Sequence, residues 1–213
     1  MAYLLADSKS ALDEDEGLEF KDIPAWNAQE KMGKLDRNRQ PISKTICAFL
    51  NSQDGGHIYA GINDDGVVKG LLLSPMQKDH IRLSLADLRQ RYRPPIPKDR
   101  LHFRFVPVRP SPNPQPWQEE KSLEEDKVRQ ELEHQLRSPD CACDQLASEA
   151  FVEKADSVGR WVLEVGVKGD EKLQPLFRNE EGLIYTRSLC ANIQMTAQQI
   201  VELAKMQHNN GIA

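Results

Sequence analysis

The residues best suited to chemistry near the start of this chain are Glu14 and Glu19, two carboxylates five positions apart. Gly17 lies between them, and Lys21 follows directly after the sequence Glu19-Phe20. Carboxylate oxygens are ligands that hard divalent cations prefer. Two glutamates in such a place can therefore hold a divalent metal, provided that the chain brings them together.

The alternation of residues 18–21 predicts a strand in which Glu19 and Lys21 share the polar face and their apolar neighbours face a core. Five is an odd number, so a continuous strand would send Glu14 and Glu19 to opposite faces. They converge only if the chain bulges or turns between them, as Gly17 would allow. The alternative is an acidic, solvated segment that leads into an ordinary edge strand.

Helices and strands that would position these residues follow along the chain without strict alternation. Ile42, Ile46, Phe49 and Leu50 form the buried stripe of a helix over residues 41–50. Further patterns predict a strand over residues 57–62, a hairpin turn at 63–66, a helix that begins at Pro75 after the capping pair Ser74 and Gln77, and a strand through Leu101, Phe103 and Phe105. This mixture predicts an α+β domain.

The second half of the chain begins with an insertion. Five prolines between Pro107 and Pro116 predict a linker outside the sheet interior, and a charged helix with a narrow apolar stripe follows it. Strands are then predicted over 160–167 and around 183–187, and the capping box of Thr196 and Gln199 predicts a last helix. We therefore divide one domain into residues 1–106 and 159–213, with residues 107–158 as a Pro-rich and acidic helical insertion that is either a partner-docking segment or a surface loop.

Length and composition agree with one domain inside the cell. The chain has 213 residues, of which 39% are hydrophobic, and it has no apolar run of about 20 residues that would span a membrane. No signal peptide is recognisable at the start, so a cytoplasmic location is expected. The four cysteines are too scattered for a disulfide framework. Cys141 and Cys143 are close enough to share a metal, but nothing completes a tetrahedral zinc set, and loop thiols are the alternative.

The charge distribution is more informative than the net charge of −5. Residues 117–156 carry twelve acidic and five basic residues, whereas the rest of the chain has a small positive excess. Residues 78–109 hold nine basic residues against three acidic ones, which predicts a strip that faces phosphates. The candidates for RNA binding in this strip are Arg82, Arg89, Arg91, Arg93, Lys98 and Arg100. A solvated helix face followed by a charged loop is the alternative.

Several of these segments together resemble one family pattern. Residues 14–21 resemble the E-x4-E-F-K signature of the schlafen family, and residues 47–64 resemble its A-F-x-N-[ST]-x-G-G-x5-G-[VI]-x-D block. Residues 185–187 and the helix at Thr196 resemble the close of the same divergent Alba-type (AlbA-2) domain. The resemblance covers nearly everything except residues 107–158, and it is nearest to short schlafen-like proteins with one lobe, including those that process the 5′ ends of piRNA precursors.

The resemblance implies a metal-dependent endoribonuclease that acts on structured or precursor RNA. Its three catalytic acids correspond to Glu14, Glu19 and Asp64, which would hold Mg²⁺ or Mn²⁺. Lys21 would bind the phosphate or hold the carboxylate geometry. Asp65 is an alternative to Asp64 in the same turn, and a hairpin turn needs such residues in any protein.

Departures from the family pattern limit what the resemblance implies. One extra residue separates Asn51 from the glycine pair, and the family's His-x-Cys and Cys-Cys zinc elements are missing, so no structural zinc is expected. The chain corresponds to one lobe of a two-lobed core, so a homo- or heterodimer with another schlafen-like lobe is expected to complete the RNA channel. The alternatives to a nuclease are a non-catalytic RNA-binding or scaffold lobe of such a complex and a DNA-binding regulator.

Overall fold

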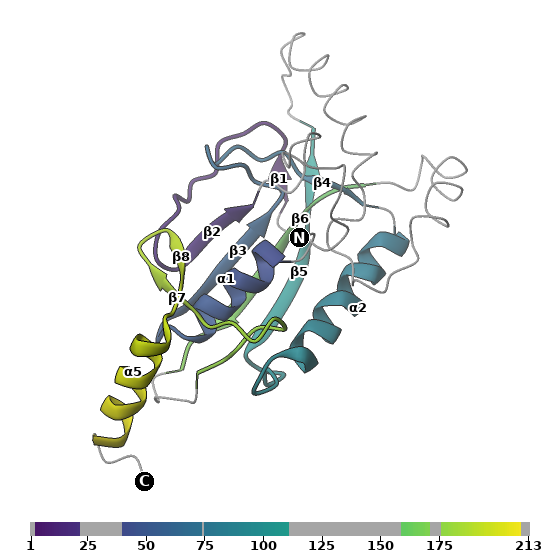
Figure 1. Ribbon diagram of the computed structural model, residues 1–213. Helices are drawn as coiled ribbons and strands as arrows, with labels where there is room; N and C mark the ends of the chain where they lie inside the picture. The colour runs from purple at the N-terminus through teal and green to yellow at the C-terminus, as the bar shows by residue number, and fades with distance from the viewer. Residues whose placement is uncertain (1–2, 22–39, 74, 111–158, 171–175, 210–213) are drawn as a thin grey trace, which may run out of the picture.

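The computed structural model describes residues 3–21, 40–73, 75–110, 159–170 and 176–209 (Figure 1). Its centre is a six-stranded mixed sheet made of β1 (Leu4–Leu5), β2 (Leu18–Lys21), β3 (Gly55–Ala60), β4 (Leu71–Leu73), β5 (Leu101–Arg109) and β6 (Gly159–Lys168). The strand order is β1-β5-β6-β3-β2, and β4 pairs with β6 beside that path. The pairs β1–β5 and β2–β3 are parallel, and the others are antiparallel. The α+β prediction is confirmed, and β2 is an edge strand.

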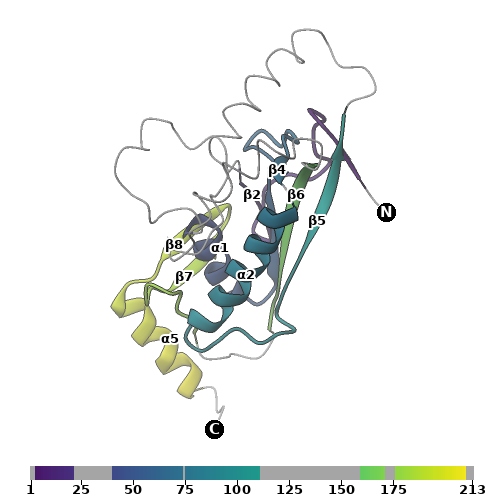
Figure 2. The same ribbon diagram turned by 90° about the vertical axis from the view of Figure 1, so that its right-hand side faces the viewer.

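Helices α1 (Gln40–Leu50) and α2 (Pro75–Arg91) both lie on one face of this sheet (Figure 2). A two-stranded hairpin, β7 (Tyr185–Ser188) and β8 (Ala191–Gln194), packs against α1. The last helix, α5 (Ala197–Asn209), projects away from this body in both views. Because α1 lies between the sheet and the hairpin, its polar residues Ser43 and Thr45 are as fully buried as its apolar stripe.

The alternation of the central strands separates two apolar clusters. Ile58 of β3 and Val165 of β6 belong to the larger cluster, beneath the helices. Phe20 and Val162 belong to a smaller one on the opposite face. This alternation confirms that Phe20 faces a core, and it places Glu19 on the helix-covered face.

The loop between β3 and β4 is closed at its base by two glycines. Gly61 has a φ of 102° and Gly70 a φ of 72°, and the amide of Gly70 donates to the carbonyl of Gly61 at 2.7 Å. A Cβ on Gly61 would lie 3.1 Å from the Cα of Gly70, so the close approach needs glycine. At the tip, the amide of Gly66 donates to the carbonyl of Asn63 at 2.8 Å, which confirms the predicted turn and places Asp64 in it.

Two predicted boundaries have clear outcomes. The capping box at the start of α5 is confirmed, because the Thr196 amide donates to Gln199 Oε1 at 2.9 Å and the Gln199 amide to Thr196 Oγ1 at 3.3 Å. The prediction that the linker outside the sheet starts at Pro107 is wrong for that residue, because Pro107 pairs with Trp161 within the β5–β6 ladder. Among the described residues, the short strand β1 pairs with β5 only at Val108 and Arg109, so no pairing there requires the amide hydrogen that Pro107 lacks.

Other predictions lie outside the described residues. These are the Ser74 cap and the helical part of the insertion (residues 111–158) with its cysteine pair. Among the helices that the structure describes, none combines the length and the apolar character needed to cross a membrane.

Candidate active site at the edge strand

The segment that leads into β2 reverses direction in a tight turn. The amide of Asp15 donates to the carbonyl of Leu18 at 3.3 Å, the amide of Leu18 donates back at 3.4 Å, and the Gly17 amide donates to Asp15 Oδ1 at 2.8 Å. We call residues 14–19 the acid turn. The turn folds Glu14 back along β2, where its Oε1 accepts a hydrogen bond from the Phe20 amide at 2.6 Å. The predicted bend between the two glutamates is therefore present.

The glycine that this turn requires is Gly56 of β3 rather than Gly17. A Cβ on Gly17 would meet only Asp15 Oδ1, at 3.7 Å. A Cβ on Gly56 would lie 2.5 Å from the Phe49 ring and 2.7 Å from the Gly17 carbonyl oxygen, which itself accepts the His57 amide at 2.7 Å. The acid turn thus packs against β3 at a distance that only a glycine in β3 permits.

Glu19 is buried on the helix-covered face, with only 5% of its surface exposed. Its Oε1 forms an ion pair with Lys21, as expected for two residues on the same face of β2. Its Oε2 lies 2.5 Å from Nη1 of Arg187 on β7. That contact lacks the alignment of a hydrogen bond, so Glu19 Oε2 and Arg187 Nε are buried without hydrogen-bond partners among the described residues.

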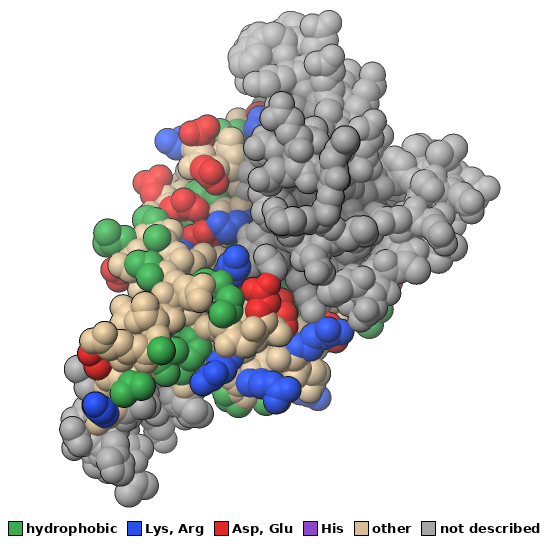
Figure 3. Space-filling view, in the orientation of Figure 1, with side chains coloured by type: hydrophobic (Ala, Val, Ile, Leu, Met, Phe, Trp, Pro, Cys, Tyr) green, Lys and Arg blue, Asp and Glu red, His purple; other side chains and the backbone are tan. Residues whose placement is uncertain are grey.

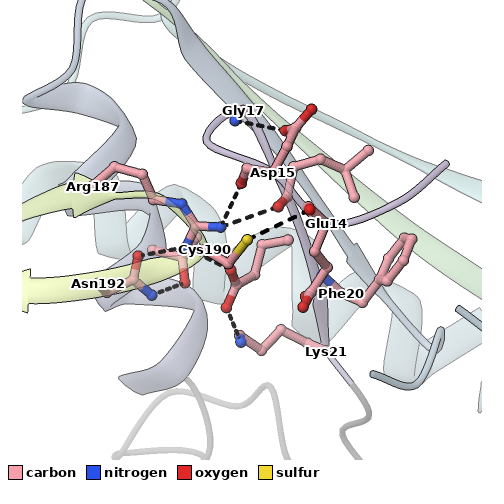
Figure 4. A network of polar contacts seen from close by, with 11 residues as sticks. Glu14, Asp15, Gly17, Phe20, Lys21, Arg187, Cys190 and Asn192 are labelled. Atoms are coloured by element: carbon pink, nitrogen blue, oxygen red, sulfur yellow. Dashed lines mark hydrogen bonds and ion pairs between the residues drawn. The ribbon is translucent and has the colours of Figure 1, made fainter. Parts of the chain in front are cut away.

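Arg187 connects the β7–β8 hairpin to the acid turn (Figure 4). Its Nη2 donates to the carbonyls of Asp15 at 2.9 Å and Leu18 at 3.1 Å, and its Nη1 donates to Asn192 Oδ1 at 3.1 Å. Asn192 in turn donates to Thr45 Oγ1 on α1 at 2.8 Å. A buried polar chain therefore runs from α1 through the hairpin to the carboxylate of β2.

Sequence reasoning assigned no role to Arg187, although a signal was present. Alternation along β7 places Arg187 on the same face as Tyr185, which is buried against α1. A charged residue at a core-facing position needs a compensating charge, and that charge is Glu19. The sequence does not say which of the chain's carboxylates would serve.

Glu14 has both Glu19 and Asp64 as acidic neighbours. The pKa of Glu14 is raised chiefly by burial, and the negative charges of Glu19 and Asp64 raise it further, while the Phe20 amide and Lys21 oppose the shift. Glu19 and Asp64 are thus both near enough to Glu14 to disfavour its ionised form. In the part of the chain that the structure describes, no group of three His, Cys, Asp or Glu side chains is arranged to hold a metal ion. Metal binding therefore stays a prediction.

Comparison with models of protein families shows which family the chain belongs to. A family model described as Schlafen, AlbA_2 matches residues 14–196. The chain belongs to this schlafen family. The match begins at Glu14 and contains the acid turn, Asp64 and Arg187, whereas α5 lies beyond it. Membership is consistent with a nuclease-like or nucleic-acid-binding role.

The predicted phosphate-facing strip of this schlafen-family chain lies away from the acids. Helix α2 lies toward the β5 side of the sheet, and β2 is at the opposite edge (Figure 1). In the space-filling view, basic side chains gather near the end of α2, and acidic ones follow the margin where the N-terminal segment lies (Figure 3). Five of the six predicted RNA-binding side chains are exposed or half-buried: Arg82, Arg89, Arg91, Arg93 and Lys98.

The sixth residue of the strip, Arg100, has a different environment. Its side chain is buried, its Nε donates to the Lys168 carbonyl at 3.1 Å, and its Nη1 lies 3.6 Å from Asp170. These contacts connect the start of β5 to the end of β6. A role for Arg100 in binding phosphate would require these contacts to break. Its assignment to the RNA surface stays a prediction, and a structural role is the alternative.

Proposed function

We propose that this chain is a metal-dependent endoribonuclease, or the catalytic subunit of one, that cleaves structured precursor RNA by phosphodiester hydrolysis. The substrates are tRNA-like RNAs or small-RNA precursors of the piRNA type. The observation that carries the proposal is the position of Glu14, which is folded back along β2 and whose ionised form is disfavoured by burial and by the nearby charges of Glu19 and Asp64. Lys21 pairs with Glu19 beside it. An acidic side chain whose pKa is raised by burial and by neighbouring acids is a common feature of functional sites.

The donor set fits a hard cation. All three acids offer carboxylate oxygens, the ligand type that Mg²⁺ and Mn²⁺ prefer, and Glu19 Oε1 contacts only the partly exposed Lys21 among the described residues, a partner that can move away. Such a cation, when bound, stabilises charge on the scissile phosphate and activates a water molecule. Ligation requires Glu14 in its ionised form, which its raised pKa disfavours until a positive charge is present.

The remaining residues of the site would orient the RNA. Lys21 is partly exposed, and its ammonium group is at the end of a flexible side chain. It can therefore move from Glu19 to a phosphate oxygen of the substrate. The basic residues of α2 lie over the other half of the sheet, where they would bind the RNA backbone away from the cut. A second copy of the chain, or a related lobe, would supply the opposite wall of the channel.

A nuclease assay tests the proposal. Purified protein, with and without a candidate second lobe, is incubated with short hairpin RNAs in Mn²⁺, Mg²⁺ or EDTA. We expect metal-dependent cutting that Glu19→Gln abolishes. Glu164→Gln is the matched control, since Glu164 is 6% exposed and Glu19 is 5% exposed, but Glu164 lies on the opposite face of the sheet. Cutting by Glu19→Gln at the wild-type rate would contradict the assignment.

One observation favours a second candidate function, a non-catalytic RNA-binding lobe. Both oxygens of Glu19 are already in ion pairs, with Lys21 and Arg187, so the carboxylate is neutralised without any metal. In that case RNA binds without turnover in every metal and with every partner lobe. Tighter binding to duplex DNA than to RNA would instead indicate a DNA-binding regulator.

A further inference from the structure

We propose that Arg187 is the positioning residue of this site. It fixes Glu19 Oε2 and the acid turn from within the protein, so that Glu19 Oε1 is the oxygen left for a cation, with Lys21 as its exchangeable partner. The inference rests on the proposed function, and it assigns different roles to the two positive charges beside Glu19.

Burial distinguishes the two positive charges. The Arg187 side chain is 2% exposed and the Lys21 side chain is 25% exposed. Lys21 ends a strand at the sheet edge and can rotate its ammonium group into solvent or toward a phosphate. Arg187 has no such freedom, because its guanidinium lies over the Phe49 ring, 5.3 Å from the centroid, and is enclosed by the hairpin and the acid turn.

The shape of the guanidinium group explains why the residue is arginine. One nitrogen, Nη2, donates to the carbonyls of Asp15 and Leu18, the two residues whose backbones bond to each other across the turn. The other, Nη1, contacts Glu19 and donates to Asn192. A lysine ammonium could pair with Glu19 but could not reach both ends of the turn and the asparagine in fixed directions.

The connection from the acid turn to the rest of the fold gives Arg187 its influence on geometry. Asn192 orients Nη1 and is itself oriented by Thr45, a fully buried residue of helix α1. The position of Glu14 depends on the same turn, because its carboxylate bonds to the Phe20 amide only when the chain is folded back. Loss of Arg187 therefore changes the relative positions of Glu14 and Glu19 and not only the charge beside Glu19.

The test compares Arg187→Lys, which keeps the charge and loses the fork, with Arg178→Lys, the same exchange at an exposed arginine. Three quantities are measured on the full chain: Mn²⁺ affinity by titration without RNA, kcat and KM for hairpin RNA, and hydrogen exchange of the Phe20 amide. We expect Arg187→Lys to weaken Mn²⁺ binding by about 10- to 100-fold and to lower kcat with KM nearly unchanged. Phe20 exchange should be at least about tenfold faster, and Arg178→Lys should change none of these values.

Lys21→Met supplies the contrast. Removal of the exchangeable charge should leave Mn²⁺ binding as tight as in the wild type or tighter, because a competing cation is gone. If Lys21→Met and Arg187→Lys weaken Mn²⁺ binding equally, the assignment of separate roles is wrong. If Arg187→Lys does not fold, Asn192→Ala loosens the same guanidinium without removing it and should show the same changes at smaller size.

Hydrogen exchange separates this inference from the proposed function. If the wild type binds no Mn²⁺ and cuts no RNA while Arg187→Lys still accelerates exchange at Phe20, the proposed function fails and the positioning role stands. If Phe20 exchange, Mn²⁺ affinity and kcat of a folded Arg187→Lys all equal those of the wild type, the positioning role is overturned whatever the activity of the protein.

Discussion

Glu19 and Glu164 are two buried glutamates on neighbouring parts of the same sheet, and each pairs with an arginine. Glu19 lies under the hairpin and pairs with Arg187, whose side chain is 2% exposed. Glu164 lies on the opposite face and pairs with Arg104 at 2.6 Å, but the Arg104 side chain is 68% exposed. His57 approaches Glu164 as well, at 3.4 Å.

The difference shows how similar ion pairs can serve different purposes. The exposed Arg104 can leave Glu164 for water, so that pair only compensates the charge of the carboxylate. Arg187 cannot leave Glu19, and its remaining donors hold backbone carbonyls of the acid turn. A pair that fixes the backbone as well as the charge is suited to holding a carboxylate in one orientation, as catalysis by positioned acids requires.

The largest effect is expected when the ion pair between Glu19 and Arg187 is broken. Arg187→Met should lower the free energy of unfolding by about 3–5 kcal/mol, because it leaves Glu19 buried with only Lys21 and deprives two carbonyls of a donor. Urea unfolding at pH 7 measures the loss.

Arg104→Met is the matched substitution on the opposite face and should cost clearly less than Arg187→Met, because the Arg104 side chain is 68% exposed. His57 stays beside Glu164, and water can reach the site that Arg104 leaves. Equal losses in the two variants would remove the distinction between the pairs.

The second prediction disturbs the packing around the Phe49 ring, over which the Arg187 guanidinium lies. Gly56→Ala places a methyl group against the Phe49 ring and the Gly17 carbonyl, so we expect a loss of about 1–3 kcal/mol and weaker RNA cutting. Gly17→Ala, inside the acid turn itself, should cost less than Gly56→Ala because its Cβ has room. The same unfolding measurement decides between them, and a reversed order would show that the turn does not depend on close packing against β3.

The smallest expected change in the free energy of unfolding is an increase, and it comes from a substitution at Glu14. Folding raises the pKa of Glu14, so the folded state binds more protons than the unfolded state as pH rises past the ordinary glutamate value, and wild-type stability falls through that window. Glu14→Gln keeps the acceptor for the Phe20 amide and removes the charge. It should raise the free energy of unfolding at pH 7 by less than about 1 kcal/mol and abolish RNA cutting.

Thermal melting as a function of pH checks this prediction. The gain in Glu14→Gln should shrink as the pH falls from the raised pKa of Glu14 and vanish below the ordinary glutamate pKa, where the carboxyl is protonated in the folded and the unfolded state. A variant less stable than the wild type at every pH would show that the Glu14 charge stabilises the acid turn.

Local patterns predicted most of the secondary structure, because the physics behind them is short-range. Apolar patterns predicted strands where β3 and β6 lie, and the spacing of Thr196 and Gln199 identified the start of α5 down to its two hydrogen bonds. The pattern was wrong at Pro107, since whether a proline can join a ladder depends on what lies across its other edge. It also attributed to Gly17 a requirement that belongs to Gly56.

The sequence by itself determined the chemistry on offer at the opening segment: two glutamates, a turn between them, and a lysine on the face of the second. Only the tertiary structure decided which positive charge holds Glu19, because Arg187 comes from a strand more than 160 positions later, and its bond to the Leu18 carbonyl spans 169 positions. An ion pair in the interior is strong and oriented because water is excluded, and that exclusion exists only once the hairpin, α1 and β2 have packed together.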